Sequence, residues 1–414
     1  MLQKRDHIHY FDYLRIIAAI SVIYMHVAAI PLRGAVNMQW QMLNVCTSFA
    51  FTAVPLFFMI SGYLLLSDSK TKDISVLLRR RIPRLIIPLI GWTVVALLWL
   101  TFSGGTLSVS SIANGLISAL NTPAMIHFWY MYTIIAMYLI SPFLYGAIHS
   151  LEKKGHIYIL VLIALVSVKT ILRTILPPPF TDLLNIDFIT KLEFFGGHLC
   201  TFILGFYLGS CRRKIPNWIL IVGAILTLAI ITAGTYFRTA AAGTYMQDFQ
   251  NQNAGFEILL ASCIFLLFKQ NCNKKVLWLR PVVTTLVSLS LSIYMMHNIL
   301  LSMFYAVGIS PQTKIEVTLV TLLNLAICTL VLKTVATIKP ICYLATGMSY
   351  KAACNSCNWV YTYRWIKRRF QKKKIDTPQE KEKPWIPWLF FLPNRRICNF
   401  RLLLCSFQLE DHRP

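Results

Sequence analysis

Residues 11–32 read FDYLRIIAAISVIYMHVAAIPL. The stretch is long and apolar enough to cross a bilayer as a helix, yet it contains Arg15 and His26. An ionisable side chain at bilayer depth is costly unless it faces protein or water. At about 100° per residue and about 1.5 Å rise, the two side chains share one helix face, roughly 16 Å apart. The sequence therefore predicts a functional polar stripe along this helix.

The rest of the chain has the composition of a polytopic helical membrane protein. Of its 414 residues 56% are hydrophobic and only 14% are charged, and the mean hydropathy is +0.59. This balance excludes an ordinary soluble domain. The net charge of +24 would suggest nucleic acid in a soluble protein. Here the basic residues flank apolar spans, so topology explains most of them and no nucleic-acid partner is expected.

Neither a leader peptide nor a cysteine framework is expected. The start MLQKRDHIHY leads directly into a full-length span without a small-residue cleavage site. The 11 cysteines are scattered and do not form a disulfide pattern. Cys354 and Cys357 make a single CxxC, which is weak support for a metal site, and we expect no metal.

The apolar runs predict an all-α bundle of about ten transmembrane helices, because an open sheet would leave backbone groups unpaired in lipid. The eighth run is short and is expected to begin earlier than drawn. The runs fall at roughly 10–32, 43–66, 85–102, 127–148, 157–176, 192–210, 217–235, 255–269, 284–307 and 315–345.

The distribution of basic residues predicts the orientation. The loops on one side hold Lys4, Arg5, Lys70, Lys72, Arg79, Arg80, Arg81, Arg84, Lys153, Lys154, Arg212, Arg213, Lys214, Lys269, Lys274, Lys275 and Arg280. The opposite loops hold only Arg33, Arg173, Lys191, Arg238 and Lys314. The positive-inside rule then places both termini in the cytoplasm, in a multi-pass protein of the plasma (inner) membrane.

Three segments are predicted along the chain: a transmembrane domain over 1–345, a basic juxtamembrane segment over 346–375, and a cytoplasmic tail over 376–414. The run WIKRRFQKKK is expected to lie against anionic lipid headgroups, and DTPQEKEKP to be disordered. The outer loops 103–126, 177–191 and 236–254 are long. They either line an acceptor cleft or are flexible connectors.

His26 is the candidate catalytic base, because the pKa of a histidine lies close to working pH. Arg15 would act beside it, and Asp12, one turn earlier, would orient Arg15 or be an interfacial charge. The alternative is structural. Arg15 would then reach the headgroups, and His26 would bond a neighbouring helix.

The segment 77–88, LLRRRIPRLIIP, brings a dense cationic cluster to the start of the third span. Arg81 and Arg84 are three residues apart and would project to one side of a helix. Guanidinium groups bind phosphate in a bidentate manner, which suits a phosphorylated cytoplasmic donor such as coenzyme A. The alternative is that the cluster only anchors the span on the inner side.

Several further residues are candidate supporting groups. In FFMISGYLLL, residues 57–66, Ser61 and Gly62 favour close helix packing rather than a nucleophile. The aromatics of HFWYMYTIIAMYLISP, residues 127–142, suit a membrane-interface belt or a sugar-stacking platform. The remaining candidates are each a helix contact or a site residue; they are Glu193, His198, Glu257 and His297.

Taken together these motifs resemble acyltransferase family 3. The resemblance is carried by Arg15 and His26 with ten residues between them, and by RIPR at 81–84, FFMISGY at 57–63, the HFWYMYTIIAMYLISP stretch and SLSIYMMHN. It covers roughly residues 8–345. Each motif alone is degenerate, but their combination with ten spans is fairly specific.

The resemblance implies an integral membrane O-acyltransferase that moves an acyl group, usually acetyl from cytoplasmic acetyl-CoA, to a hydroxyl of a cell-surface or lipid-linked glycan. By position, His26 matches the family's essential histidine, Arg15 its paired basic residue, and Arg81 and Arg84 its RxxR. Some relatives append an extracytoplasmic hydrolase-like domain, which is not expected in this sequence. Either the transmembrane unit completes the transfer, or a separate extracytoplasmic partner does.

Two other classes of function stay open. A transporter or flippase of lipid-linked glycans would also suit ten spans and intramembrane charges. The sequence shows neither repeated halves nor a clearly broken helix pair. A membrane sensor or scaffold would use the basic tail without catalysis. The sequence identifies neither the acceptor nor the acyl chain. It also does not distinguish direct transfer from a covalent intermediate, and it does not give the oligomeric state.

Overall fold

The computed structural model describes residues 8–176, 180, 197–273 and 280–376, with side chains up to Arg368. Within these residues every regular element is helical and none is a strand, which confirms the predicted all-α class. The chain divides into Met1–Arg368 and Arg369–Pro414. The helical bundle belongs to the first of these units. The predicted tail lies, from residue 377 onward, outside the described residues.

Among the described residues, eight helical segments are long and apolar enough to cross a membrane. They are His9–Ala28, Met38–Leu66, Ile74–Ser103, Ile126–Ser150, Lys153–Ile175, Asn217–Ala242, Arg280–Ala306 and Lys314–Val335. Two further apolar helices, Gly197–Ser210 and Gly255–Asn271, are shorter.

The long helices are α1 (His9–Ala28), α2 (Met38–Ala50), α3 (Ala53–Leu66), α5 (Pro83–Ser103), α7 (Trp129–Ser150), α8 (Lys153–Ile175), α11 (Gly197–Ser210), α12 (Asn217–Ala242), α13 (Gly255–Asn271), α14 (Arg280–Ala306) and α15 (Lys314–Val335). The short elements are η1 (Pro31–Arg33), η2 (Ser69–Lys72), α4 (Ile74–Val76), the π-helical turn η3 (Leu77–Arg81), α6 (Val109–Ser118), η4 (Ile126–Phe128), α16 (Lys339–Thr346) and α17 (Tyr350–Ala353). Helix α18 spans Trp359–Asp376.

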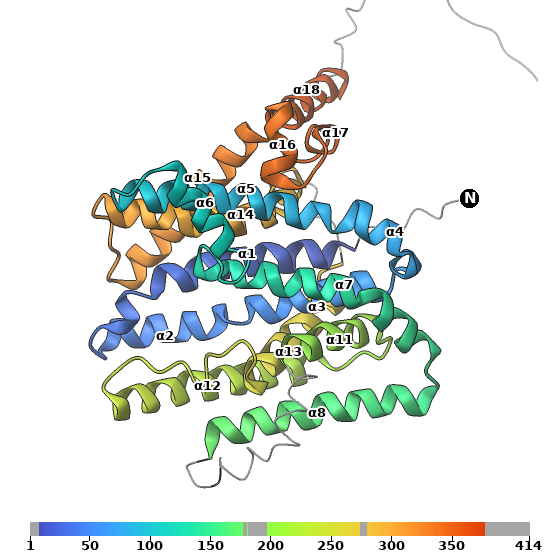
Figure 1. Cartoon of the computed structure of the whole chain (residues 1–414). Coiled ribbons are helices and arrows are strands. Elements are labelled where there is room, and N and C mark those ends of the chain that lie inside the picture. The colour runs from blue at the N-terminus through green and yellow to red at the C-terminus, as the bar shows by residue number, and fades with distance from the viewer. Residues whose placement is uncertain (1–7, 177–179, 181–196, 274–279, 377–414) are drawn as a thin grey trace, which may run out of the picture. The chain divides into compact units, whose positions relative to one another are not determined.

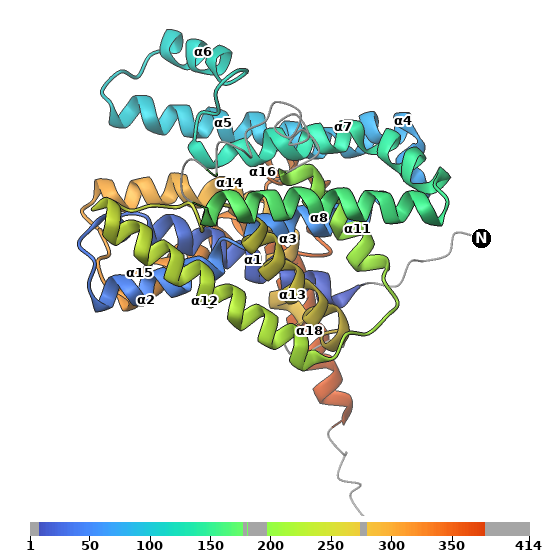
Figure 2. The same cartoon turned by 90° about the horizontal axis from the view of Figure 1, so that it is seen from below.

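The first helix occupies the centre of the bundle. It packs against α2, α3, α13, α14 and α15, and the long helices lie side by side around it (Figures 1 and 2). The connections α3–α5 and α7–α8 lie at one end, and the connections α1–α2 and α14–α15 lie at the other (Figure 1). A polar side chain on α1 therefore meets protein on most sides rather than lipid.

The most extensive helix contact joins α3 to α11, and glycines make it possible. A Cβ at Gly62 would lie 1.8 Å from the Phe202 carbonyl oxygen, and one at Gly205 would lie 2.1 Å from the Met59 carbonyl oxygen. Only glycine lets the two backbones approach this closely. The close helix packing predicted at Gly62 is thereby confirmed.

Two predicted spans are not single helices. The second consists of α2 and α3, with a break at Phe51 and Thr52. The break arises because Pro55 has no N–H to donate to the Phe51 carbonyl, and its ring crowds that carbonyl. The tenth was predicted to run to residue 345, but α15 ends at Val335 and α16 starts at Lys339. Pro340 in the first turn of α16 favours a new helix start there.

The start of the eighth span and the loop 103–126 also differ from the prediction. The eighth span does not begin earlier than predicted, because α13 starts at Gly255, directly after the hydrogen-bonded turn that links the Ala254 N–H to the Asn251 carbonyl. The outer loop 103–126 contains α6, which the hydrophobic pattern did not separate. The Ser108 hydroxyl caps this helix by accepting from the Ser111 N–H, as serine commonly does.

The loop after α12 is anchored by a buried polar network. The Gln250 side-chain amide is fully buried and donates to Asn44 Oδ1 (2.8 Å) and Ser48 Oγ (2.9 Å) on α2. Its carbonyl oxygen accepts from the Tyr245 hydroxyl. Burial raises the pKa of Tyr245, which keeps this hydroxyl protonated as a donor. This part of the predicted loop 236–254 is therefore fixed to the bundle rather than loosely attached.

Candidate active site

Three histidine rings meet where α1, α14 and the start of α7 come together. His26 comes from α1, His127 from η4 and His297 from α14. The ring centroids lie 5.2 Å apart for His26 and His297, 5.9 Å for His26 and His127, and 4.7 Å for His127 and His297. We refer to these three residues as the histidine cluster.

Hydrogen bonds orient two of the three rings. His297 Nδ1 faces the Tyr294 carbonyl at 2.6 Å, so Nδ1 carries the proton and Nε2 is left as an acceptor. That Nε2 is buried and has no hydrogen-bond partner among the described residues. His127 Nε2 faces the Met295 carbonyl at 3.3 Å, and its Nδ1 lies 3.3 Å from the Asn298 amide nitrogen. The carbonyl partners thus require a proton on His297 Nδ1 and on His127 Nε2.

His26 differs from its two neighbours in being only partly buried. His127 is 2% exposed and His297 is 0% exposed, whereas His26 is half-buried. Its ring makes no hydrogen bond within the described part of the chain. His26 is therefore the member of the cluster that can take a proton from a bound hydroxyl.

Arg15 lies toward the other end of the same face of α1. It is within Coulombic range of Asp12 on its own helix and of Tyr130 and Tyr138 on α7. Asp12 is buried and provides a negative charge one turn away, as expected from the sequence. The guanidinium group is thus surrounded by protein groups that can orient it, rather than by lipid.

Tyr138 on α7 interacts electrostatically with three arginines. It lies within Coulombic range of Arg15, Arg81 and Arg84, which come from α1, η3 and α5. Arg15 of the predicted stripe and the predicted RxxR cluster therefore share an electrostatic neighbour.

Arg81 and Arg84 have different surroundings. Arg81 forms an ion pair with Asp68 (Nη2 to Oδ2, 2.6 Å) and donates to the Thr71 hydroxyl (2.7 Å). Its guanidinium fork is used within the protein. Arg84 is exposed and has no ion-pair partner among the described residues. Of the two predicted phosphate ligands, Arg84 is the one whose side chain is available.

Tyrosines connect the two ends of the site. The Tyr130 ring lies 5.3 Å from the ring of Tyr294. The Tyr294 hydroxyl donates to the His127 carbonyl. We call the set Arg15, Tyr138, Tyr130, Tyr294 and the histidine cluster the polar seam. It runs from the arginine end to His26 through α1, α7 and α14.

This arrangement agrees with a comparison against known families. A family model described as an acyltransferase domain matches residues 8–333, which include every residue of the polar seam. The chain belongs to acyltransferase family 3. Membership supports acyltransferase activity in general for this multi-pass membrane protein. No curated protein and no solved structure shows a significant match to the chain.

Other predicted supporting residues lie elsewhere in the acyltransferase fold. The His198 ring is stacked between Phe58 (4.6 Å) and Trp129 (5.0 Å), which is a packing environment. Glu257 is 0% exposed on α13, and both its carboxylate oxygens lack a hydrogen-bond partner among the described residues. The structure does not bring either residue into the histidine cluster. Glu193 lies outside the described residues.

The sequence analysis missed four residues of the polar seam of this family member. They are His127, Tyr130, Tyr138 and Tyr294. The first three lie in the stretch 127–142, where aromatics were interpreted as an interface belt or a sugar platform. The available signal was spacing, because Tyr130, Ile134 and Tyr138 repeat every four residues and so line one face of a helix.

Proposed function

We propose that this acyltransferase moves an acetyl group from cytoplasmic acetyl-CoA to a hydroxyl of a cell-surface or lipid-linked glycan. The observation that carries the proposal is the histidine cluster, in which a partly buried His26 lies beside two imidazoles that are held by backbone carbonyls. In the proposed topology α11 and α13 also cross the membrane. That gives ten crossings, with both termini and the arginine end on the cytoplasmic side.

The arginine end is the proposed donor entrance. Arg84 is exposed there and would bind a phosphate of the acetyl-CoA through its guanidinium fork. Arg81 would hold the turn through Asp68 and Thr71. Arg15, deeper along α1, would supply positive charge near the thioester as negative charge develops on its carbonyl oxygen.

His26 would act as the general base. It takes the proton from the acceptor hydroxyl as that oxygen attacks the thioester carbonyl carbon. The new C–O bond forms, the C–S bond breaks, and the coenzyme A thiolate leaves and is protonated. Oxygen replaces sulfur on the acyl carbon without a change of oxidation state, so the step needs no oxidant or reductant.

His127 and His297 would be positioning residues in this scheme. Their tautomers are fixed by the backbone carbonyls of Met295 and Tyr294, so both rings stay in place against His26. A base held in one geometry reacts faster than one that must find it.

The proposal is tested by mass spectrometry of cell-surface glycans with and without the chain, combined with acetyl transfer by the purified protein. Loss of an acetyl group from a glycan on deletion, together with thioester-dependent labelling in vitro, supports acyl transfer. A transporter would instead be identified by loss of the whole glycan from the surface, with the acetylation of the glycan inside the cell unaltered, and by the absence of labelling in vitro.

A further inference from the structure

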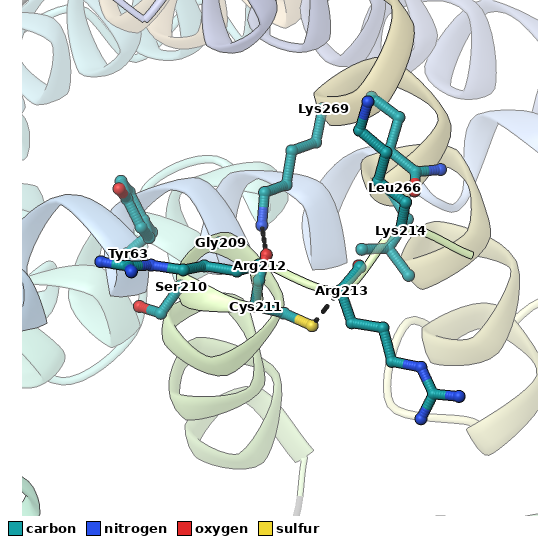
Figure 3. Close-up of a pocket in the computed structure, with 10 residues that line it drawn as sticks. Tyr63, Gly209, Ser210, Cys211, Arg212, Arg213, Lys214, Leu266 and Lys269 are labelled. Carbon is teal, nitrogen blue, oxygen red and sulfur yellow. Dashed lines mark hydrogen bonds between the residues drawn. The ribbon is translucent and has the colours of Figure 1, made fainter.

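A second cationic feature lies at the end of the bundle where α3 and α11 finish. A pocket of about 530 Å³ opens there, shown in Figure 3. It is lined by Tyr63 of α3, by the last turn of α11, by the linker to α12 and by the last turn of α13. Neither the family match nor the proposed transfer chemistry assigns this pocket a role.

The walls of the pocket are held by hydrogen bonds between α13 and the linker. Lys269 Nζ donates to the Leu208 carbonyl (2.7 Å) and to the Cys211 carbonyl; the bond to Cys211 is drawn in Figure 3. Gln270 accepts from the Ile215 N–H (2.9 Å) and donates to the Ile215 carbonyl (3.1 Å). The linker between α11 and α12 is therefore a fixed wall.

The inner wall of the pocket depends on a close packing of small and aromatic residues. A Cβ at Gly209 would lie 2.1 Å from the Tyr63 ring, so glycine is needed for Tyr63 to pack there. The Tyr63 ring in turn lies 5.3 Å from Phe11, which is one turn before Arg15 on α1. The pocket is therefore connected by packing to the polar seam.

The lining is strongly basic. Arg212, Arg213, Lys214 and Lys269 contribute to it, and no carboxylate does among the described residues. Lys269 uses its ammonium group on the last carbonyls of α11. The other three side chains are exposed, and within the described ranges no acidic side chain pairs with them. Figure 3 shows the side chains of Arg212 and Arg213 extending in opposite directions from the chain.

We propose that this pocket binds the phosphate group of an anionic ligand at the same end of the bundle as Arg84. Unpaired guanidinium and ammonium groups around a concave site attract phosphate both by charge and by directed hydrogen bonds. Two sources carry that chemistry here: the phosphates of coenzyme A and the headgroup of an anionic phospholipid. The proposal that this pocket binds phosphate does not depend on the proposed acyl transfer, because the basic lining is present whichever reaction the polar seam performs.

The test uses the purified full-length protein in phosphatidylcholine nanodiscs with two probes, coenzyme A and phosphatidylglycerol. The pocket variant is Arg212→Gln with Arg213→Gln. The matched control is Lys153→Gln with Lys154→Gln, which removes the same charge from exposed positions at the α7–α8 connection. Because all four side chains are exposed, both variants should fold, and thermal unfolding checks this. Arg212→Lys with Arg213→Lys keeps the charge.

The expected result is that the pocket variant weakens binding of one probe about tenfold or more, a change of about 1.4 kcal/mol. The control and the lysine variant stay close to wild type. Loss for coenzyme A identifies the donor as the ligand, and loss for phosphatidylglycerol identifies a lipid headgroup. The proposal is overturned if wild type binds neither probe, if the pocket variant binds both as wild type does, or if the control loses binding equally. The His26→Ala protein should still bind the probe. A failure of the proposed transfer chemistry can therefore be distinguished from a failure of the proposed phosphate binding.

Discussion

The imidazole rings of His26 and His297 lie 5.2 Å apart between centroids, although they come from opposite ends of the bundle's sequence. They meet because α1 and α14 pack along each other. His297 has its Nδ1 fixed by the Tyr294 carbonyl and an Nε2 without a hydrogen-bond partner in the described part of the chain. This pairing places a second imidazole beside the proposed base. The role of each histidine can therefore be tested by a separate substitution.

Replacing His297 with alanine should lower the turnover number while the protein still inserts. Without the fixed neighbour, the His26 ring loses its orientation, and misplaced catalytic groups cost up to about 10²-fold in rate. The measurement is kcat and KM for acetyl transfer. A positioning role lowers kcat and leaves KM for acetyl-CoA near the wild-type value. A change in KM alone would contradict it.

Arg84→Gln and Arg81→Gln should have different effects. Losing a charge-assisted bond to phosphate costs about 1.5–3 kcal/mol, so Arg84→Gln should raise KM for acetyl-CoA about tenfold or more, with kcat little changed. Arg81→Gln should mainly lower stability, by about 1 kcal/mol or less, because its pair with Asp68 is partly exposed. Equal KM effects of both changes would show that Arg81 also binds the donor.

Gly62→Ala should destabilise the bundle without touching the polar seam. The added Cβ would lie 1.8 Å from a backbone oxygen of α11, so α3 and α11 must move apart. Overpacking of this kind costs about 1–3 kcal/mol. Gly146→Ala on α7 is the control, because nothing lies within 4 Å of the Cβ that alanine would add there, and alanine favours a helix by up to about 1 kcal/mol. Thermal unfolding in detergent compares the two, and equal melting temperatures would refute the close contact.

Gln250→Ala should detach the loop after α12 from the bundle. The change removes the bonds to Asn44 and Ser48 and leaves Asn44 Oδ1 with only the long bond from Ser48 Oγ (3.5 Å), and weakening a buried polar network in this way costs about 1–3 kcal/mol. Limited proteolysis should then cut within 243–254 faster than in wild type. The same cleavage rate in both proteins would show that the network does not hold the loop.

The sequence was sufficient to predict the all-helical class and to place Arg15 and His26 on one face of α1. The period of an α-helix is fixed, so the positions of Arg15 and His26 followed from counting residues, and the glycine at position 62 predicted a close contact correctly. Helix ends inside apolar runs were less predictable. The break before α3 and the end of α15 depend on Pro55 and Pro340, and the hydrophobic pattern continues across both.

The partners of His26 could not be derived from the sequence. Helices that are consecutive in the chain need not be neighbours, and nothing local to His127 or His297 shows that η4 and α14 meet α1. The sequence also did not show which of Arg81 and Arg84 is paired within the protein, because the ion pair between Arg81 and Asp68 depends on the path of the turn between α3 and α5. Tertiary packing decides both.

The central claim is that His26 removes the acceptor proton, and the most direct measurement is acetyl transfer by purified His26→Ala protein from labelled acetyl-CoA. His149→Ala is the matched control, since His149 is an exposed histidine at the opposite end of α7. A general base contributes about 10²–10⁴-fold. The account predicts a loss of that size for His26→Ala, with wild-type melting temperature and donor binding, and near-normal transfer for His149→Ala. Transfer by His26→Ala at the wild-type rate would contradict it.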